Sequence, residues 1–314
     1  MTTTVPLDHI RRLRRDGTLV VIDGGMGSEL EAQGATMDHD AWSGLVNLAD
    51  PGLVRRVHED YVHAGADVLI TNTFMSGSGP MDRAGASDRF EPANRNAVKA
   101  AREATLEADR PIAIAGSVSV TQLGAPDGGS PGPGPGAAGG GDHRRLRDGY
   151  ARQIELLAEE GVDLIALEMV DHPRYAEPAV EAALGAGLPI WLGLCVHADE
   201  RDRGEAPAAS ITAQHRQVAR LAQGDAFDAV CVMHTDIDDV DAVLSLVGET
   251  WDGPVGVYPH HGVWRRPSWQ FLDLPAERFT ELARGWRSAG VSMIGGCCGI
   301  GPAQISALRT GLEA

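Results

Sequence analysis

The chain has 314 residues, of which 43% are hydrophobic, and its formal net charge is −17. Such an acidic protein offers no basic face to nucleic acid or to an anionic membrane surface, which excludes both as partners. No apolar run approaches the length of a membrane span and no signal-peptide pattern is present, so the sequence predicts a cytoplasmic protein. The four cysteines do not form a disulfide framework, which leaves reduced thiols or a metal site.

Short apolar runs alternate along the chain with longer amphipathic ones. Gly, Pro or Asp bounds each apolar run, as is typical of strands, and several amphipathic runs begin at Pro and end at Gly, as helices do. In chain order, we expect strands at residues 19–23, 67–71, 111–117, 163–168, 189–194, 228–233, 254–258 and 291–295. We expect helices at residues 51–63, 92–108, 145–160, 175–184, 212–222, 238–247, 275–289 and 302–312.

This alternation predicts the α/β class, with a single (β/α)8 TIM barrel over residues 1–314. An open doubly wound sheet is the alternative, but no G-x-G-x-x-G follows the first strand. Residues 124–142 are almost entirely Gly, Pro and Ala, which predicts a flexible loop after the third strand. In a barrel this loop lies on the catalytic face, so it is either a lid or an insertion without a role.

The active site of such a barrel gathers residues from the carboxyl ends of its strands. Any strand that enters a loop ends in polar residues, which explains Asn72 or Ser117 without a function. Glu168 is different, because a carboxylate between apolar Leu167 and Met169 needs a partner. In chain order the strand ends bring Asp23, Gly24, Gly25 and Glu29, then Asn72, Ser117, Glu168, Cys195, His234, Tyr258, His260 and His261, and finally Cys297 and Cys298.

Two adjacent cysteines follow the last strand, in the sequence Gly295-Gly296-Cys297-Cys298-Gly299. Two thiolates at one strand end can ligate one metal ion, and the flanking glycines let backbone and substrate come close. The alternatives are two buried core thiols or a vicinal disulfide, which would close a strained ring and is disfavoured in the cytosol. We interpret the pair as part of a metal site.

Together these motifs resemble the homocysteine S-methyltransferase family, zinc-dependent barrels that include betaine– and S-methylmethionine–homocysteine methyltransferases. The resemblance runs from about residue 20 to residue 308. It implies Zn²⁺ as cofactor, a sulfonium or ammonium methyl donor, homocysteine or a related amino-acid thiol as acceptor, and a role in methionine biosynthesis. The matching stretches are DGGMGSEL at 23–30, AGAD at 64–67, TNTF at 71–74, GSV at 116–118, DLIALE at 163–168, VYP at 257–259 and IGGCCG at 294–299.

The resemblance also implies three zinc ligands, and here the chain departs from the family. Cys297 and Cys298 match two of the ligands, but the third, a family cysteine, falls on His234. Either His234 replaces that cysteine, or the site has lost zinc, or Cys231 serves instead from about 10 Å down the strand with the opposite side-chain parity. Because zinc accepts imidazole nitrogen readily, we predict His234, Cys297 and Cys298 as the catalytic metal ligands.

The exchange of a thiolate for an imidazole changes the charge of the site. With the substrate thiolate bound, three cysteines would give zinc a net charge of about −2, and the mixed set leaves about −1. A bound thiolate is then less electron-rich and a bound water more acidic. Two alternatives to methyl transfer therefore stay open: a zinc-dependent hydrolase or lyase, and a catalytically silent amino-acid-binding homologue.

The resemblance assigns the remaining strand ends to substrate. Glu168 would hold the acceptor's ammonium group and the first-strand glycines its carboxylate, while Asp23 and Asn72 would line the donor side. His260 and His261 replace Asn and a small residue of relatives, so they would recruit another substrate group, act as a base, ligate metal or face solvent. Trp264 or Trp269 could face a cationic donor. The predicted substrate-binding residues are Asp23, Gly24, Gly25, Glu29, Asn72, Glu168, Tyr258 and His260.

Overall fold

Eight parallel strands form one sheet in the computed structural model, which describes residues 4–120, 140–196, 211–222, 224–265 and 268–312. The bridge between Ile22 and Val68 joins the two outer strands and closes the sheet, so the predicted (β/α)8 barrel is confirmed. Around the barrel the strands are β1 (Val20–Val21), β10 (Met293–Ile294), β7 (Val255–His260), β6 (Ala229–Asp236), β5 (Ile190–Leu194), β4 (Leu164–Val170), β3 (Ala113–Ser119) and β2 (Val68–Ile70).

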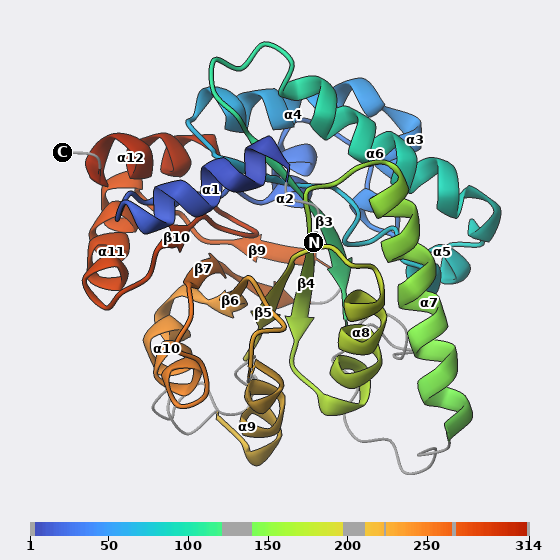
Figure 1. Ribbon diagram of the computed structural model, residues 1–314. Coiled ribbons are helices and arrows are strands. Elements are labelled where there is room, and N and C mark those ends of the chain that lie inside the picture. Colours follow the sequence, from blue (N-terminus) through green and yellow to red (C-terminus); the bar gives the residue numbers. More distant parts are fainter. Residues whose placement is uncertain (1–3, 121–139, 197–210, 223, 266–267, 313–314) are drawn as a thin grey trace.

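Helices surround the strands, as Figure 1 shows. The helix α4 (Pro51–His63) has the predicted bounds, because the Asp50 side chain accepts the Leu53 N–H at 2.8 Å and Pro51 occupies the first turn. No described helix is long and apolar enough to cross a membrane. The helix α12 (Pro302–Leu312) also has its predicted bounds. The other predicted helices are present with bounds shifted by a few residues: α6 (Phe90–Ala104), α7 (Gly140–Glu159), α8 (Pro173–Gly185), α9 (Ala213–Ala219), α10 (Val240–Gly248) and α11 (Ala276–Ser288).

The expected loop over residues 124–142 lies mostly outside the described residues, which resume where α7 begins at Gly140. Several elements were not predicted. Most are short, and the largest are the helix α1 and a two-stranded antiparallel hairpin. These elements are α1 (Val5–Arg15), α2 (Met26–Ala32), α3 (Val46–Ala49), α5 (Ser78–Arg83), β8 (Gly262–Arg265) and β9 (Ser268–Phe271).

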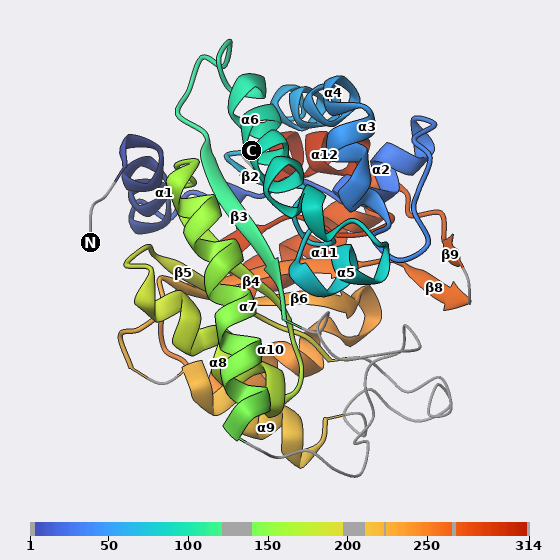
Figure 2. The same ribbon diagram turned by 90° about the vertical axis from the view of Figure 1, so that its right-hand side faces the viewer.

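The helix α1 covers the end of the barrel where the strands begin. Its residues Leu7 and Ile10 are fully buried in one cluster with barrel residues such as Trp191. Figure 2 shows α1 at one end of the barrel and the β8–β9 hairpin at the opposite end, beyond the carboxyl ends of the strands. The strand ends that carry the candidate site therefore open on the side away from α1.

One buried histidine makes the stability of this fold depend on pH. His58 of α4 is fully buried, and neither of its ring nitrogens has a hydrogen-bond partner among the described residues. Burial disfavours the charged imidazole and lowers the pKa of His58 from 6.5 to about 3. Because the unfolded chain binds this proton more readily, stability present above pH 6.5 is lost as the pH falls toward 3.

We expect this histidine to lower the free energy of unfolding by about 2 kcal/mol between pH 7.5 and pH 5. Denaturant titrations at the two pH values measure the difference. His58→Leu should flatten the pH dependence by that amount, whereas His63→Gln, on the exposed end of the same helix, should leave it in place. An unchanged pH dependence in His58→Leu would contradict the assignment.

Candidate metal and substrate site

Irregular backbone at the ends of β4 and β6 forms the centre of the site. The register of β4 against β5 shifts between Leu167 and Val170, and that of β6 against β7 shifts between Met233 and Asp236. Within these shifts Met169 has φ 55° and His234 has φ 53°, a left-handed conformation that residues other than glycine adopt at an energetic cost. Such bulges re-aim the side chains near them.

The imidazole of His234 lies between a carboxylate and a thiol. Its Nε2 is 2.7 Å from Oε2 of Glu168, and its Nδ1 is 3.1 Å from Sγ of Cys297. The Sγ atoms of Cys297 and Cys298 are 3.7 Å apart, and all four side chains are largely buried. The structure thus brings together the three residues that the sequence predicts as metal ligands.

The donor types and the separation of the two sulfurs suit zinc. Tetrahedral zinc with bonds of about 2.3 Å to sulfur and 2.0 Å to nitrogen separates two sulfurs by about 3.8 Å, and a sulfur from a nitrogen by about 3.5 Å. The observed 3.7 Å between the sulfurs matches this geometry, and the 3.1 Å from Cys297 to His234 is slightly short. Within the described part of the chain, no three His, Cys, Asp or Glu side chains are already arranged around a metal position.

Glu168 has the partners that its buried position requires. The hydroxyl of Ser117 donates to Oε1, while Oε2 faces His234. Ser117 is itself held through its backbone, because its N–H donates to Thr71 at 3.1 Å and its carbonyl accepts from Thr73 at 2.7 Å. Both oxygens of Glu168 are therefore engaged within the protein.

Three further side chains surround His234. The ring of Phe74 lies over the imidazole with centroids 4.8 Å apart, and the ring of Tyr258 stands edge-on at 6.4 Å. The thiol of Cys195 donates to the His234 carbonyl at 3.2 Å. Phe74 was not predicted as a site residue. Its motif was noted, but an aromatic side chain after a strand carries no chemical signal of its own.

The four cysteines are free thiols, so the vicinal disulfide is not formed. A hydrogen bond with Cys298, together with burial, raises the pKa of Cys297. Cys231 lies in the barrel interior with no exposed surface, where burial raises its pKa to about 12. No contact joins Cys231 to the cluster among the described hydrogen bonds, so its position favours His234 as the third ligand.

Glycine is required where the chain after β1 meets the loop that carries Cys297 and Cys298, here called the cysteine loop. A Cβ atom on Gly25 would lie 2.6 Å from the carbonyl oxygen of Cys297, and one on Gly24 would lie 2.4 Å from that of Ile300. The Gly25 N–H, expected near the acceptor's carboxylate, donates instead to Ile300 at 2.9 Å. These glycines therefore hold the cysteine loop against β1 through close backbone contact.

The two residues expected on the donor side form internal hydrogen bonds. Asp23 accepts from the backbone N–H of Ile70 at 2.8 Å, and burial raises the pKa of its carboxyl group well above the usual value. Asn72 donates to the Ser43 carbonyl at 3.0 Å and to the Asn47 side chain at 2.9 Å. Both are almost completely buried, so in this structure they support the loops around the site.

The other predicted substrate residues have different surroundings. Glu29 on α2 accepts from Gln33 at 3.1 Å in an exposed contact. Tyr258 donates to the Gly24 carbonyl at 2.9 Å, and His260 is buried with its Nε2 3.9 Å from Asp236. The backbone N–H of His261 donates to the Cys298 carbonyl at 2.9 Å. The side chains of Trp264 and Trp269 lie outside the description.

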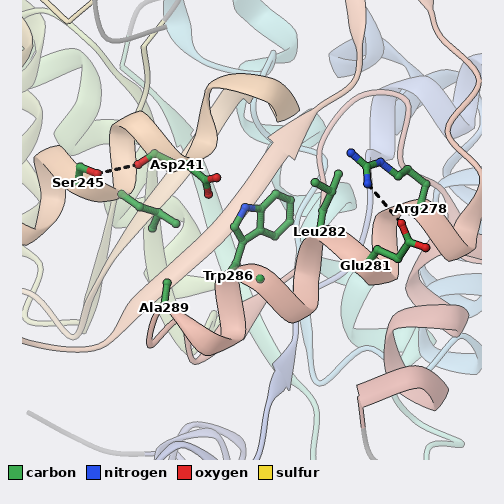
Figure 3. Close-up of a pocket in the computed structure, with 9 residues that line it drawn as sticks. Asp241, Ser245, Arg278, Glu281, Leu282, Trp286 and Ala289 are labelled. Atoms are coloured by element: carbon green, nitrogen blue, oxygen red, sulfur yellow. Dashed lines mark hydrogen bonds and ion pairs between the residues drawn. The ribbon is translucent and has the colours of Figure 1, made fainter.

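A surface groove between α10 and α11 is separate from this site. Figure 3 shows its lining side chains on the two helices of the outer layer, including Asp241 and Trp286. The groove contains none of the cysteines. Within it Ser245 donates to the Asp241 carbonyl, and Arg278 contacts Glu281. None of its lining residues is one of the predicted site residues at the strand ends.

Comparison with known proteins identifies the family of the chain. The sequence model of the family described as homocysteine S-methyltransferase matches residues 20–312. Homocysteine S-methyltransferase 4 of Zea mays is 30% identical, over 94% of this chain and 90% of its own, and selenocysteine methyltransferase of Astragalus bisulcatus is 27% identical, over 93% and 92%. The metallated form of the homocysteine methyltransferase MmuM from Escherichia coli superposes with a TM-score of 0.75 at 25% identity, covering 96% of this chain and 99% of that one. The chain belongs to the homocysteine S-methyltransferase family.

Proposed function

We propose that the protein transfers a methyl group from a sulfonium or quaternary ammonium donor to the thiol of homocysteine or a related amino acid, using zinc held by His234, Cys297 and Cys298. The observation that carries this proposal is the convergence of these three side chains at the strand ends of the barrel. Membership of the family, its homocysteine- and selenocysteine-methylating relatives and the metallated MmuM structure support it.

Zinc in this position would act as a Lewis acid that lowers the pKa of the acceptor thiol, about 8.5 in water, so that a thiolate is present at neutral pH. The protein's own residues supply position and enclosure. The backbone of Cys297 packs closely against Gly25, which follows β1, and Phe74 and Tyr258 flank the imidazole of His234. Holding acceptor and donor in line for attack on the methyl carbon accounts for much of the rate that such a site can provide.

A product assay tests the proposal. Purified protein loaded with zinc is incubated with homocysteine and, in turn, S-methylmethionine, S-adenosylmethionine and betaine, and the products are identified by mass spectrometry. We expect methionine with at least one donor and about one zinc per chain. Zinc-loaded protein that forms no methionine with any donor would refute methyl transfer to homocysteine, and hydrolysis or elimination products would favour the hydrolase or lyase alternative.

A further inference from the structure

We propose that Glu168 is a positioning residue that holds the His234 imidazole with Nδ1 presented to the metal, an inference that rests on the proposed function. The two ring nitrogens face different groups. Nε2 is 2.7 Å from Oε2 of Glu168, and Nδ1 is 3.1 Å from Sγ of Cys297. The carboxylate oxygen accepts the Nε2 proton, which leaves the lone pair of Nδ1 directed at the cysteine pair.

Glu168 is itself fixed and can therefore fix the ring. The Ser117 hydroxyl donates to its other oxygen, and Thr71 and Thr73 hold the Ser117 backbone. With 2% of its surface exposed, the residue has little freedom to turn toward solvent. The orientation of the carboxylate is thus set by β3 and β4 before any ligand binds.

His234 is restrained from its other sides as well. Its backbone has a positive φ of 53°, and its carbonyl accepts the Cys195 thiol at 3.2 Å. The ring of Phe74 covers one side of the imidazole at 4.8 Å between centroids. With this support the hydrogen bond to Glu168 selects which nitrogen remains available for a metal ion.

A carboxylate behind a ligating histidine fixes the tautomer and raises the basicity of the ligand, and its loss commonly lowers metal affinity by about 10- to 100-fold. A cysteine side chain at position 234 would offer the metal its single sulfur and would have no N–H for Glu168 to accept. The contribution of Glu168 to metal affinity should therefore depend on the imidazole. A carboxylate that served only to bind the acceptor's ammonium group would change KM and leave zinc affinity unaltered.

A double-mutant cycle with zinc as the probe tests this dependence. Zinc affinity of the full-length protein is measured by competition with a chromophoric chelator for wild type, Glu168→Ala, His234→Cys and the double variant. We expect Glu168→Ala to weaken zinc binding about 10- to 100-fold in the histidine background and less than about threefold in the cysteine background. Glu168→Gln should recover most of the affinity, because its amide oxygen still accepts the Nε2 proton.

An equal loss of zinc affinity in the histidine and cysteine backgrounds, or no loss of zinc affinity in the histidine background, would overturn the inference. If Glu168→Ala fails to fold, histidine ¹⁵N NMR of the wild type decides, with the Nε2–H tautomer supporting the inference and the Nδ1–H tautomer refuting it. Failure of this inference differs from failure of the proposed function. A wild type that binds no zinc refutes both, whereas one that binds zinc and forms methionine without the predicted coupling refutes only the role of Glu168.

Discussion

Replacing Cys297 with alanine is expected to remove zinc binding and to lower kcat/KM for thiol methylation about 1000-fold. The thiol lies 3.1 Å from Nδ1 of His234 and 3.7 Å from Sγ of Cys298, so it is the donor that contacts both other predicted ligands. Lewis-acid activation of a thiol contributes several kcal/mol, and about 1.4 kcal/mol corresponds to each tenfold change in rate. Metal analysis and steady-state kinetics of the purified variant measure both effects.

The matched control is Cys231→Ala, which removes a thiol from the same barrel away from the strand ends. Cys231 has no exposed surface, and it lies inside the barrel among apolar side chains. Its replacement should lower stability modestly and leave zinc content unchanged. If Cys231→Ala lost zinc while Cys297→Ala kept it, Cys231 would be the ligand and the cluster at His234 would not be the metal site.

Asp67→Ala is expected to lower the free energy of unfolding by about 3 to 5 kcal/mol, because it breaks a buried ion pair at the closure of the barrel. The Asp67 side chain is 2% exposed and accepts the Val21 N–H at 2.9 Å, which links the start of β2 to β1. The same oxygen lies 2.5 Å from the guanidinium of Arg309 on α12, and Arg110 approaches the other oxygen at 3.6 Å. Removing the carboxylate takes a buried acceptor away from the Val21 N–H and from both guanidinium groups, whose remaining acceptors are backbone carbonyls such as that of Gly65.

Denaturant unfolding at neutral pH measures this loss, and Asp109→Ala is its matched control. Asp109 also contacts Arg110, at 3.5 Å, but its side chain is 93% exposed. An exposed pair of this kind contributes less than about 1 kcal/mol, so the control should unfold nearly as the wild type does. Equal stabilities of the two variants would show that burial of Asp67 does not strengthen its contacts.

The fold could be predicted because each strand is a short apolar run bounded by turn residues, and because α4 carries its own start signals at Asp50 and Pro51. The helix α1 has the same kind of start, with Pro6 in its first turn and the Thr4 hydroxyl as cap, but most of its residues are charged or polar. Few apolar positions are needed there, because only Leu7 and Ile10 are buried under the barrel. The apolar stripe of α1 is regular but narrow, with Leu7 and Ile10 buried and Leu13 partly buried against the barrel.

The composition of the site could be predicted from the rule that the carboxyl ends of barrel strands converge. This rule, together with the family resemblance, places His234 beside Cys297 and Cys298. It does not tell which way a side chain turns within its loop. Asp23 and Asn72 turn to backbone and side-chain partners that lie far away in the sequence, and the bulges at Met169 and His234 depend on how β4 and β6 meet their neighbours.

X-ray absorption spectroscopy of the zinc-loaded protein tests the ligand set of His234, Cys297 and Cys298 most directly. We expect two sulfur ligands and one imidazole nitrogen from the protein, with a third sulfur when homocysteine is added. His234→Cys should replace the imidazole signal with one more sulfur. Zinc bound only by nitrogen and oxygen, an imidazole signal that persists in His234→Cys, or a wild type that retains no zinc would contradict the assignment.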